Sequence, residues 1–136
     1  MTFVLDASTT VAWALDESNR WAAQAWTRMR GDPALVPTLW WFELRNALVV
    51  NERRGRLTER ETARFLHDIS LLAITVDRAP SEAGVLTLAR RHGLTVYDAA
   101  YLELALREAV PLATLDQALS AAAQAEGVAL VGHAAG

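Results

Sequence analysis

The sequence contains no cysteine and no lysine, and it has no apolar run long enough to span a membrane. Without cysteine, the chain has no disulfide, no thiolate nucleophile and no sulfur ligand for zinc or iron. A membrane-spanning helix needs about 20 apolar residues, so we expect none here. The apolar start MTFVLDAS lacks basic residues, which predicts a first strand rather than a signal peptide, with the cytoplasm as the expected location.

The charged residues are unusual in kind rather than in number. All 13 basic residues are arginine, and 16 acids give a formal net charge of −3, which by itself argues against a nucleic-acid binder. Hydrophobic residues make up 52% of the 136 positions, as in a globular protein with a substantial core. No linker, repeat or low-complexity segment interrupts the chain, so we predict one domain over residues 1–136.

Short apolar segments alternate with helical patterns along the whole chain. Thr58 followed by Glu61 predicts a capping box, Thr38 is the expected cap of the preceding helix, and Gly93 is expected to end a later one. This alternation predicts a doubly wound α/β fold with a mostly parallel sheet. We expect strands at 2–6, 34–36, 73–76, 111–114 and 128–131, and helices at 8–15, 19–30, 39–54, 59–72, 81–91, 98–109 and 117–126.

Three aspartates stand at junctions between an extended segment and a helix. Asp6 and Asp116 each follow a short apolar strand, and Asp98 opens a helix after the stretch 94–97, which we expect to be extended. Ligands of such sheets bind beyond the carboxyl ends of the strands, so the three acids are expected to meet at one edge. Taken singly, each aspartate has an alternative role as a helix cap.

Glu43 is expected on an apolar stripe of its helix. Its neighbours three and four positions away are Leu39, Trp40, Ala47 and the polar Asn46. A carboxylate in such surroundings must be paired, protonated or bound to a cation. The alternative to a cation site is an arginine partner from elsewhere in the chain.

Converging carboxylates repel one another unless a cation neutralises them. Because the chain has no cysteine and its three histidines stand in unrelated contexts, the ligands of such a cation are expected to be oxygens, which suit Mg²⁺ or Mn²⁺. Clusters of one or two such ions hydrolyse phosphodiesters. One ion lowers the pKa of a bound water, and a second ion about 3.5–4 Å away stabilises the leaving oxygen.

Four segments in this order resemble the PIN domain family, and within it the VapC-type toxins of bacterial toxin–antitoxin systems. The segments are FVLDASTTVAW, WFELRNAL, LTVYDAAYLELAL and LATLDQAL. The resemblance covers the whole chain and implies a five-stranded parallel sheet of order 3-2-1-4-5 between helices. It also implies a cytoplasmic endoribonuclease that depends on Mg²⁺ or Mn²⁺, a small antitoxin partner encoded alongside, and a homodimer.

The resemblance assigns roles by motif position. It implies that Asp6, Glu43, Asp98 and Asp116 are the catalytic metal ligands, with Asp116 acting through water. Ser8 and Thr114 resemble the family's hydroxyl residues that orient acids or metal-bound water, with helix capping as the alternative. Asn46, one turn from Glu43, is expected to support the ligands or else to be an ordinary polar helix residue.

A group of arginines is predicted at the tip of a helical hairpin. Arg53, Arg54 and Arg56 stand there and are expected to contact RNA phosphates. The alternative is a solvated helix face on which arginines and glutamates pair.

Five tryptophans surround these motifs: Trp13, Trp21, Trp26, Trp40 and Trp41. Most are expected in the core. Because tryptophan is enriched among interface anchors, we predict that one or two lie in an antitoxin groove. Five fully buried tryptophans would contradict this prediction.

Other classes with aspartates at strand ends fit less well. A response-regulator receiver and a haloacid-dehalogenase-like phosphatase both need a lysine, and the phosphatase needs an aspartate where Ser8 stands. The remaining alternatives are a PIN-like module that binds RNA or protein without cleaving, and a PIN nuclease outside a toxin–antitoxin pair. The complete set of four acids favours an enzyme.

Overall fold

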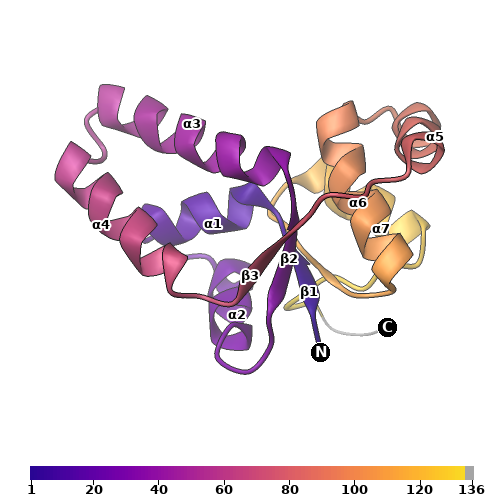
Figure 1. Cartoon of the computed structure of the whole chain (residues 1–136), viewed down its shortest axis with the longest axis horizontal. Helices are drawn as coiled ribbons and strands as arrows, with labels where there is room; N and C mark the ends of the chain where they lie inside the picture. The colour runs from indigo at the N-terminus through magenta and orange to yellow at the C-terminus, as the bar shows by residue number, and fades with distance from the viewer. Residues whose placement is uncertain (134–136) are drawn as a thin grey trace.

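The computed structural model describes residues 1–133 and has the expected α/β fold (Figure 1). Its strands pair in parallel in the order β3-β2-β1-β4. The central strand reads Phe-Val-Leu and is fully buried, as expected of a strand covered on both faces. The strands are β1 (Phe3–Leu5), β2 (Ala34–Pro37), β3 (Ile74–Asp77) and β4 (Leu112–Ala113).

The expected fifth strand is shorter than predicted. The segment 128–131 lies beside β4, where the order 3-2-1-4-5 puts it, but it forms only one parallel bridge, between Leu130 and Leu112. Two backbone hydrogen bonds make this bridge, and both involve Leu112. Because β4 itself has two residues, it offers no longer edge on which a strand can pair. The described sheet therefore has four strands and a single-residue extension.

Helices cover both faces of the sheet. Figure 1 shows α1 to α4 on one side and α5 to α7 on the other. The most deeply buried helix is α6, in which every residue from 101 to 105 is buried against the core. The helices are α1 (Ala7–Ala14), α2 (Arg20–Arg28), α3 (Leu39–Arg53), α4 (Glu59–Ser70), α5 (Glu82–His92), α6 (Val96–Glu108) and α7 (Gln117–Ala125). Within residues 1–133, none of them is long and apolar enough to cross a membrane.

The helix boundaries test the predicted caps. The capping box of Thr58 and Glu61 is confirmed, and Gly93 ends α5 in the left-handed conformation as expected. The prediction for Thr38 is wrong, because its own backbone is already helical and its side chain makes no capping hydrogen bond. The extended stretch expected over 94–97 is correct for Thr95 but wrong for residues 96 and 97, because α6 begins at Val96 with Thr95 as its cap. Asp98 therefore lies inside the first turn of α6.

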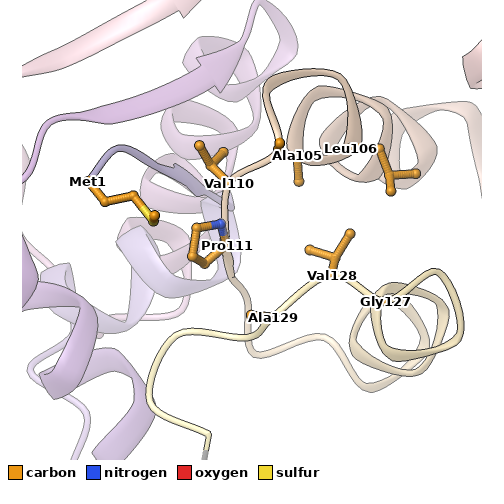
Figure 2. A pocket seen from close by; sticks show the side chains of 9 residues that line it. Met1, Ala105, Leu106, Val110, Pro111, Gly127, Val128 and Ala129 are labelled. Carbon is orange, nitrogen blue, oxygen red and sulfur yellow. The ribbon is translucent and has the colours of Figure 1, made fainter. Parts of the chain in front are cut away.

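The two edges of the sheet differ in chemistry. At the carboxyl ends of the strands, β1 is followed by Asp6, and the chain after β4 leads to Asp116. At the amino ends of the strands lies an apolar cavity of about 420 Å³ (Figure 2). Its walls include Met1, which lies two residues before β1, and Pro111, which directly precedes β4. The aspartates that follow β1 and β4 therefore lie at the carboxyl ends of the strands, where parallel sheets conventionally present their ligands.

Candidate active site

Asp6 is the most buried of the four acids, with 5% of its surface exposed. Its Oδ2 accepts hydrogen bonds of 2.6 Å from both Ser8 Oγ and Thr114 Oγ1. Although Asp6 precedes α1, its side chain accepts no capping hydrogen bond from that helix. Capping is therefore not what places this carboxylate at the end of β1.

The two hydroxyls also hold the chain after β4. Ser8 Oγ accepts a hydrogen bond from the backbone N–H of Leu115, and Thr114 Oγ1 accepts one from the N–H of Asp116. Neither hydroxyl caps a helix. They join the carboxyl ends of β1 and β4 around Asp6, so the position of Asp116 is coupled to that of Asp6.

The electrostatic environment makes the negative charge of Asp6 costly. Burial raises the pKa of Asp6, the hydrogen bonds from Ser8 and Thr114 lower it, and the negative charge of Asp116 raises it again. The net pKa is raised, because the two hydroxyls only partly replace the water lost on burial. A bound cation would supply the compensation that the hydroxyls lack.

Glu43 lies on α3 and is half-buried. Its Oε1 accepts a 2.6 Å hydrogen bond from the hydroxyl of Tyr101, which is fully buried on α6. In the described part of the chain, no arginine pairs with Glu43, so the alternative of an arginine partner is wrong. Burial raises the pKa of Glu43, the Tyr101 hydroxyl lowers it, and the charges of Asp6 and Asp98 raise it further.

Sequence reasoning did not identify Tyr101. Tyr101 follows Asp98 by three positions, so the two side chains share a face of α6, and this spacing was the available signal. Burial, the nearby charge of Asp6 and the hydrogen bond to Glu43 all raise the pKa of Tyr101, so its hydroxyl keeps its proton and acts as a donor.

Asp98 and Asp116 lie close together at the starts of α6 and α7. Burial raises the pKa of Asp98 to about 6, with the charges of Asp116 and Asp6 and a side-chain hydrogen bond with Asp116 adding to the effect. Asp116 caps α7, since its Oδ1 accepts a 3.1 Å hydrogen bond from the N–H of Ala118. The capping alternative is thus correct for one oxygen of Asp116.

The four acids form one cluster of like charge without a counter-ion. Each of Asp6, Glu43 and Asp98 has its pKa raised by the charge of at least one other member. In residues 1–133, no arginine or histidine forms an ion pair with any of the four. Carboxylate oxygens of this kind fit Mg²⁺ or Mn²⁺ by donor chemistry.

The side-chain positions are not those of a loaded metal site. Among the described residues, no three Asp, Glu or His side chains are arranged to hold one ion as they stand. Coordination by three of the acids therefore requires their side chains to reorient. The donor set fits a hard cation in chemistry and charge, and the hydroxyls of Ser8, Thr114 and Tyr101 already hold two of the acids.

The remaining predicted residues lie outside this cluster. Asn46 is exposed, and its side chain makes no hydrogen bond within the described chain, so it does not contact Glu43 through one. Arg53, Arg54 and Arg56 are exposed where α3 joins α4, at the end of α3 far from the sheet (Figure 1). From Glu43 to Arg53 the helix rises about 15 Å. These arginines make no ion pair in residues 1–133, so the predicted paired face is not observed.

The tryptophans divide between core and surface. Trp40 is buried and donates to Thr10 Oγ1, whereas Trp26 and Trp41 are 42% and 47% exposed. Trp13 donates to the carbonyl of Ala22 and meets Trp26 edge to face. Trp13, Trp26 and Phe65 line a cavity of about 420 Å³ between α1, α2 and α4, with Asp16, Glu17 and Asp68 also in its walls.

Comparisons with known proteins agree with the fold and the order of the motifs. Ribonuclease VapC3 from Pyrobaculum aerophilum is 39% identical over 83 residues, which are 58% of this chain and 63% of that protein. The match thus spans less than two thirds of the relative's length. The crystal structure of PAE2754, also from Pyrobaculum aerophilum, superposes with a TM-score of 0.70 at 26% identity, covering 90% of this chain and 84% of that one.

The model of the PIN domain family matches residues 3–125, a span that contains all four acids and the hydroxyls around them. The strand order, with β1 central and Asp6 at its end, is the one that the sequence resemblance implied. This chain belongs to the PIN domain family.

Proposed function

We propose that the protein is an endoribonuclease that depends on Mg²⁺ or Mn²⁺ and acts as the toxin of a toxin–antitoxin pair. The observation that carries this proposal is the cluster of Asp6, Glu43, Asp98 and Asp116, which has no ion-pair partner in residues 1–133 although one member is almost fully buried. The similarity to Ribonuclease VapC3 supports RNA as the substrate.

The four acids are the proposed ligands, with Asp116 contributing through water because one of its oxygens caps α7. When bound, the metal activates a water and stabilises the charge on the leaving oxygen. Ser8 and Thr114 hold one oxygen of Asp6 in place, and Tyr101 holds one oxygen of Glu43, which leaves the second oxygen of each acid for a ligand. Preorganisation of this kind limits the cost of orienting charged ligands.

RNA is proposed to extend from the acids along α3. Arg53, Arg54 and Arg56 are exposed and make no ion pair in the described chain, so their guanidinium groups are free to contact phosphates. The helix spacing puts them about 15 Å from Glu43, a distance that a few nucleotides of backbone cover.

The antitoxin is proposed to bind the aromatic cavity between α1, α2 and α4. Trp13, Trp26 and Phe65 provide the apolar anchors that interfaces favour. Three acids in the same walls favour a helix or extended segment with basic side chains. The homodimer and the cytoplasmic location remain predictions from the family resemblance.

A PIN-like module that binds RNA without cleaving it is the competing proposal. It leaves unexplained why four carboxylates are kept together at an energetic cost when no side chain neutralises them. A bound hard cation removes that cost, and the reaction that such a cation promotes is the hydrolysis of phosphodiesters.

Cleavage by the purified protein tests the proposal. We expect labelled RNA to be cut with Mg²⁺ and left intact with a chelator. Asp6→Asn and Asp98→Asn are expected to slow cleavage at least about 100-fold. The loss of a metal ligand has a larger effect than the loss of a residue that only orients the ligand. The control is Glu108→Gln, an exposed acid at the far end of α6.

Circular dichroism of each variant establishes that the fold is kept. Loss of cleavage in both aspartate variants, with full activity in the control, supports the enzyme. Equal cleavage by all of them identifies a contaminating nuclease and rejects the assignment.

A further inference from the structure

Three large aromatic side chains are exposed next to the acid cluster. Phe42 is 70% exposed, Tyr97 is 63% exposed and Trp41 is 47% exposed. Phe42 immediately precedes Glu43, and Tyr97 immediately precedes Asp98. Exposed aromatic rings gathered in one region of a soluble domain are typical of a binding surface.

Two of these rings form an ordered platform on α3. The rings of Trp41 and Phe42 meet edge to face with centroids 4.9 Å apart. The guanidinium of Arg45 lies 3.8 Å from the centroid of the Trp41 ring and donates a hydrogen bond to the Trp41 carbonyl. Arg45 thereby restricts the Trp41 ring and adds a positive charge beside an otherwise acidic region.

The third ring, Tyr97, comes from the first turn of α6. Figure 1 shows the first turns of α3 and α6 at the same end of the sheet. The hydrogen bond between Tyr101 and Glu43 joins these two helices, and the charges of Glu43 and Asp98 interact. Exposed aromatic residues therefore adjoin Glu43 and Asp98 on two helices that the Tyr101–Glu43 hydrogen bond joins.

We propose that Trp41, Phe42 and Tyr97 are base-stacking residues that hold unpaired nucleotides of the RNA beside the phosphate to be cleaved. The proposal rests on the proposed nuclease function and assigns these three side chains to the positioning of the RNA. Every base has a flat face that stacks on an aromatic ring, whereas the bases of a duplex stack on each other and are not available.

The chemistry of the surface favours RNA over a second protein. The exposed side chains are aromatic and one carries a stacked arginine, which matches a strand of bases with a charged backbone. The proposed antitoxin cavity has its own tryptophans on α1 and α2, so this surface is not needed for that partner. Contact with a second copy of the chain is the competing outcome of the test.

Binding of a fluorescein-labelled, mixed-sequence single-stranded RNA, measured by anisotropy, tests the proposal. The background is Asp98→Asn, so that the RNA stays intact. We expect Phe42→Leu and Tyr97→Leu each to raise the Kd about 10-fold, because they keep apolar bulk and lose the ring. Phe42→Tyr and Tyr97→Phe keep the ring and are expected to restore the parent Kd. Leu71→Ala, which removes an exposed leucine at the C-terminal end of α4, is the surface control.

Two further measurements decide the remaining outcomes. The same RNA annealed to its complement is expected to bind more weakly and to be insensitive to Phe42→Leu. Sedimentation is expected to show the same oligomeric state for every variant. Unchanged Kd values in both leucine variants overturn the proposal. A weaker Kd accompanied by dissociation of an oligomer also overturns it and assigns the surface to contact between copies. Since the unmodified protein's cleavage is measured separately, failure here leaves the nuclease assignment standing.

Discussion

Helix α6 contributes one acid to each of two groups of acidic side chains. The two groups differ in how their negative charge is compensated. Near its end, the buried Glu103 is bound by Arg107, whose guanidinium also reaches Asp77 at the end of β3. Near its start, Asp98 faces Asp6 and Asp116 with no cation supplied by the described residues. Both groups lie close to the ends of strands, yet only one is neutralised.

The difference separates a structural role from a functional one. Glu103 also accepts a hydrogen bond from the N–H of Ser81, so the Arg107 network ties β3, α5 and α6 together. That network is complete without any ligand. In the acid cluster, by contrast, the pKa values of Asp6, Glu43 and Asp98 are raised. Raised carboxylate pKa values of this kind are typical of a site that binds an ion.

The largest expected effect on stability comes from removing the compensating charge. Arg107→Met leaves the buried Glu103 carboxylate unpaired and is expected to lower the free energy of unfolding by about 3 kcal/mol, measured by urea denaturation. The double variant Glu103→Gln with Arg107→Met keeps an acceptor for Ser81 and removes the buried charge. We expect it to regain most of the loss. A single variant as stable as the parent contradicts a compensating role.

Removing a supporting hydroxyl from the acid cluster is expected to affect activity more than stability. Tyr101→Phe deletes the donor to Glu43 and is expected to slow RNA cleavage about 10-fold, because the carboxylate loses its fixed orientation. The free energy of unfolding is expected to fall by about 1 kcal/mol. Cleavage rates are measured with saturating Mg²⁺ and compared with the thermal midpoint. Parent-like cleavage shows that Glu43 does not depend on this hydroxyl.

The smallest effect has the opposite sign. Asp98→Asn removes one of the repelling charges, so in a chelator we expect the variant to be more stable than the parent by about 1 kcal/mol, or roughly 4 °C in Tm. Adding Mg²⁺ is expected to raise the Tm of the parent and to have little effect on the variant. Calorimetry checks both. A variant less stable than the parent in chelator contradicts the uncompensated cluster.

Much of the fold was predictable because local signals agree with the topology. The buried strand Phe3–Leu5, the capping box at Thr58 and the left-handed Gly93 each depend on a few neighbouring residues. Two predictions about helix starts were wrong, because local patterns place the ends of a helix only to within a few residues. Thr38 has a helical backbone and cannot cap, and the segment before Asp98 joins α6 because Thr95 supplies the cap one turn earlier.

The candidate site was only partly predictable. The four acids could be named because Asp6 and Asp116 follow predicted strands, Asp98 was expected at the start of a helix, and Glu43 lies on an apolar stripe. The partner of Glu43 could not, since Tyr101 is 58 residues away and reads as an ordinary core tyrosine. The exposure of Phe42 and Tyr97 could not be predicted either, because hydrophobic patterns alone predict such residues in the core.

The hydrogen bond between Thr114 and Asp6 joins residues 108 positions apart. During synthesis, Asp6 leaves the ribosome long before its hydroxyl partner Thr114 and the neighbouring Asp116 are made. A nascent chain therefore cannot assemble the acid cluster until nearly the whole domain has emerged. For a nuclease proposed to be harmful to its own cell, this order delays assembly of the proposed active site until after the walls of the proposed antitoxin cavity, which come from α1, α2 and α4, have been made.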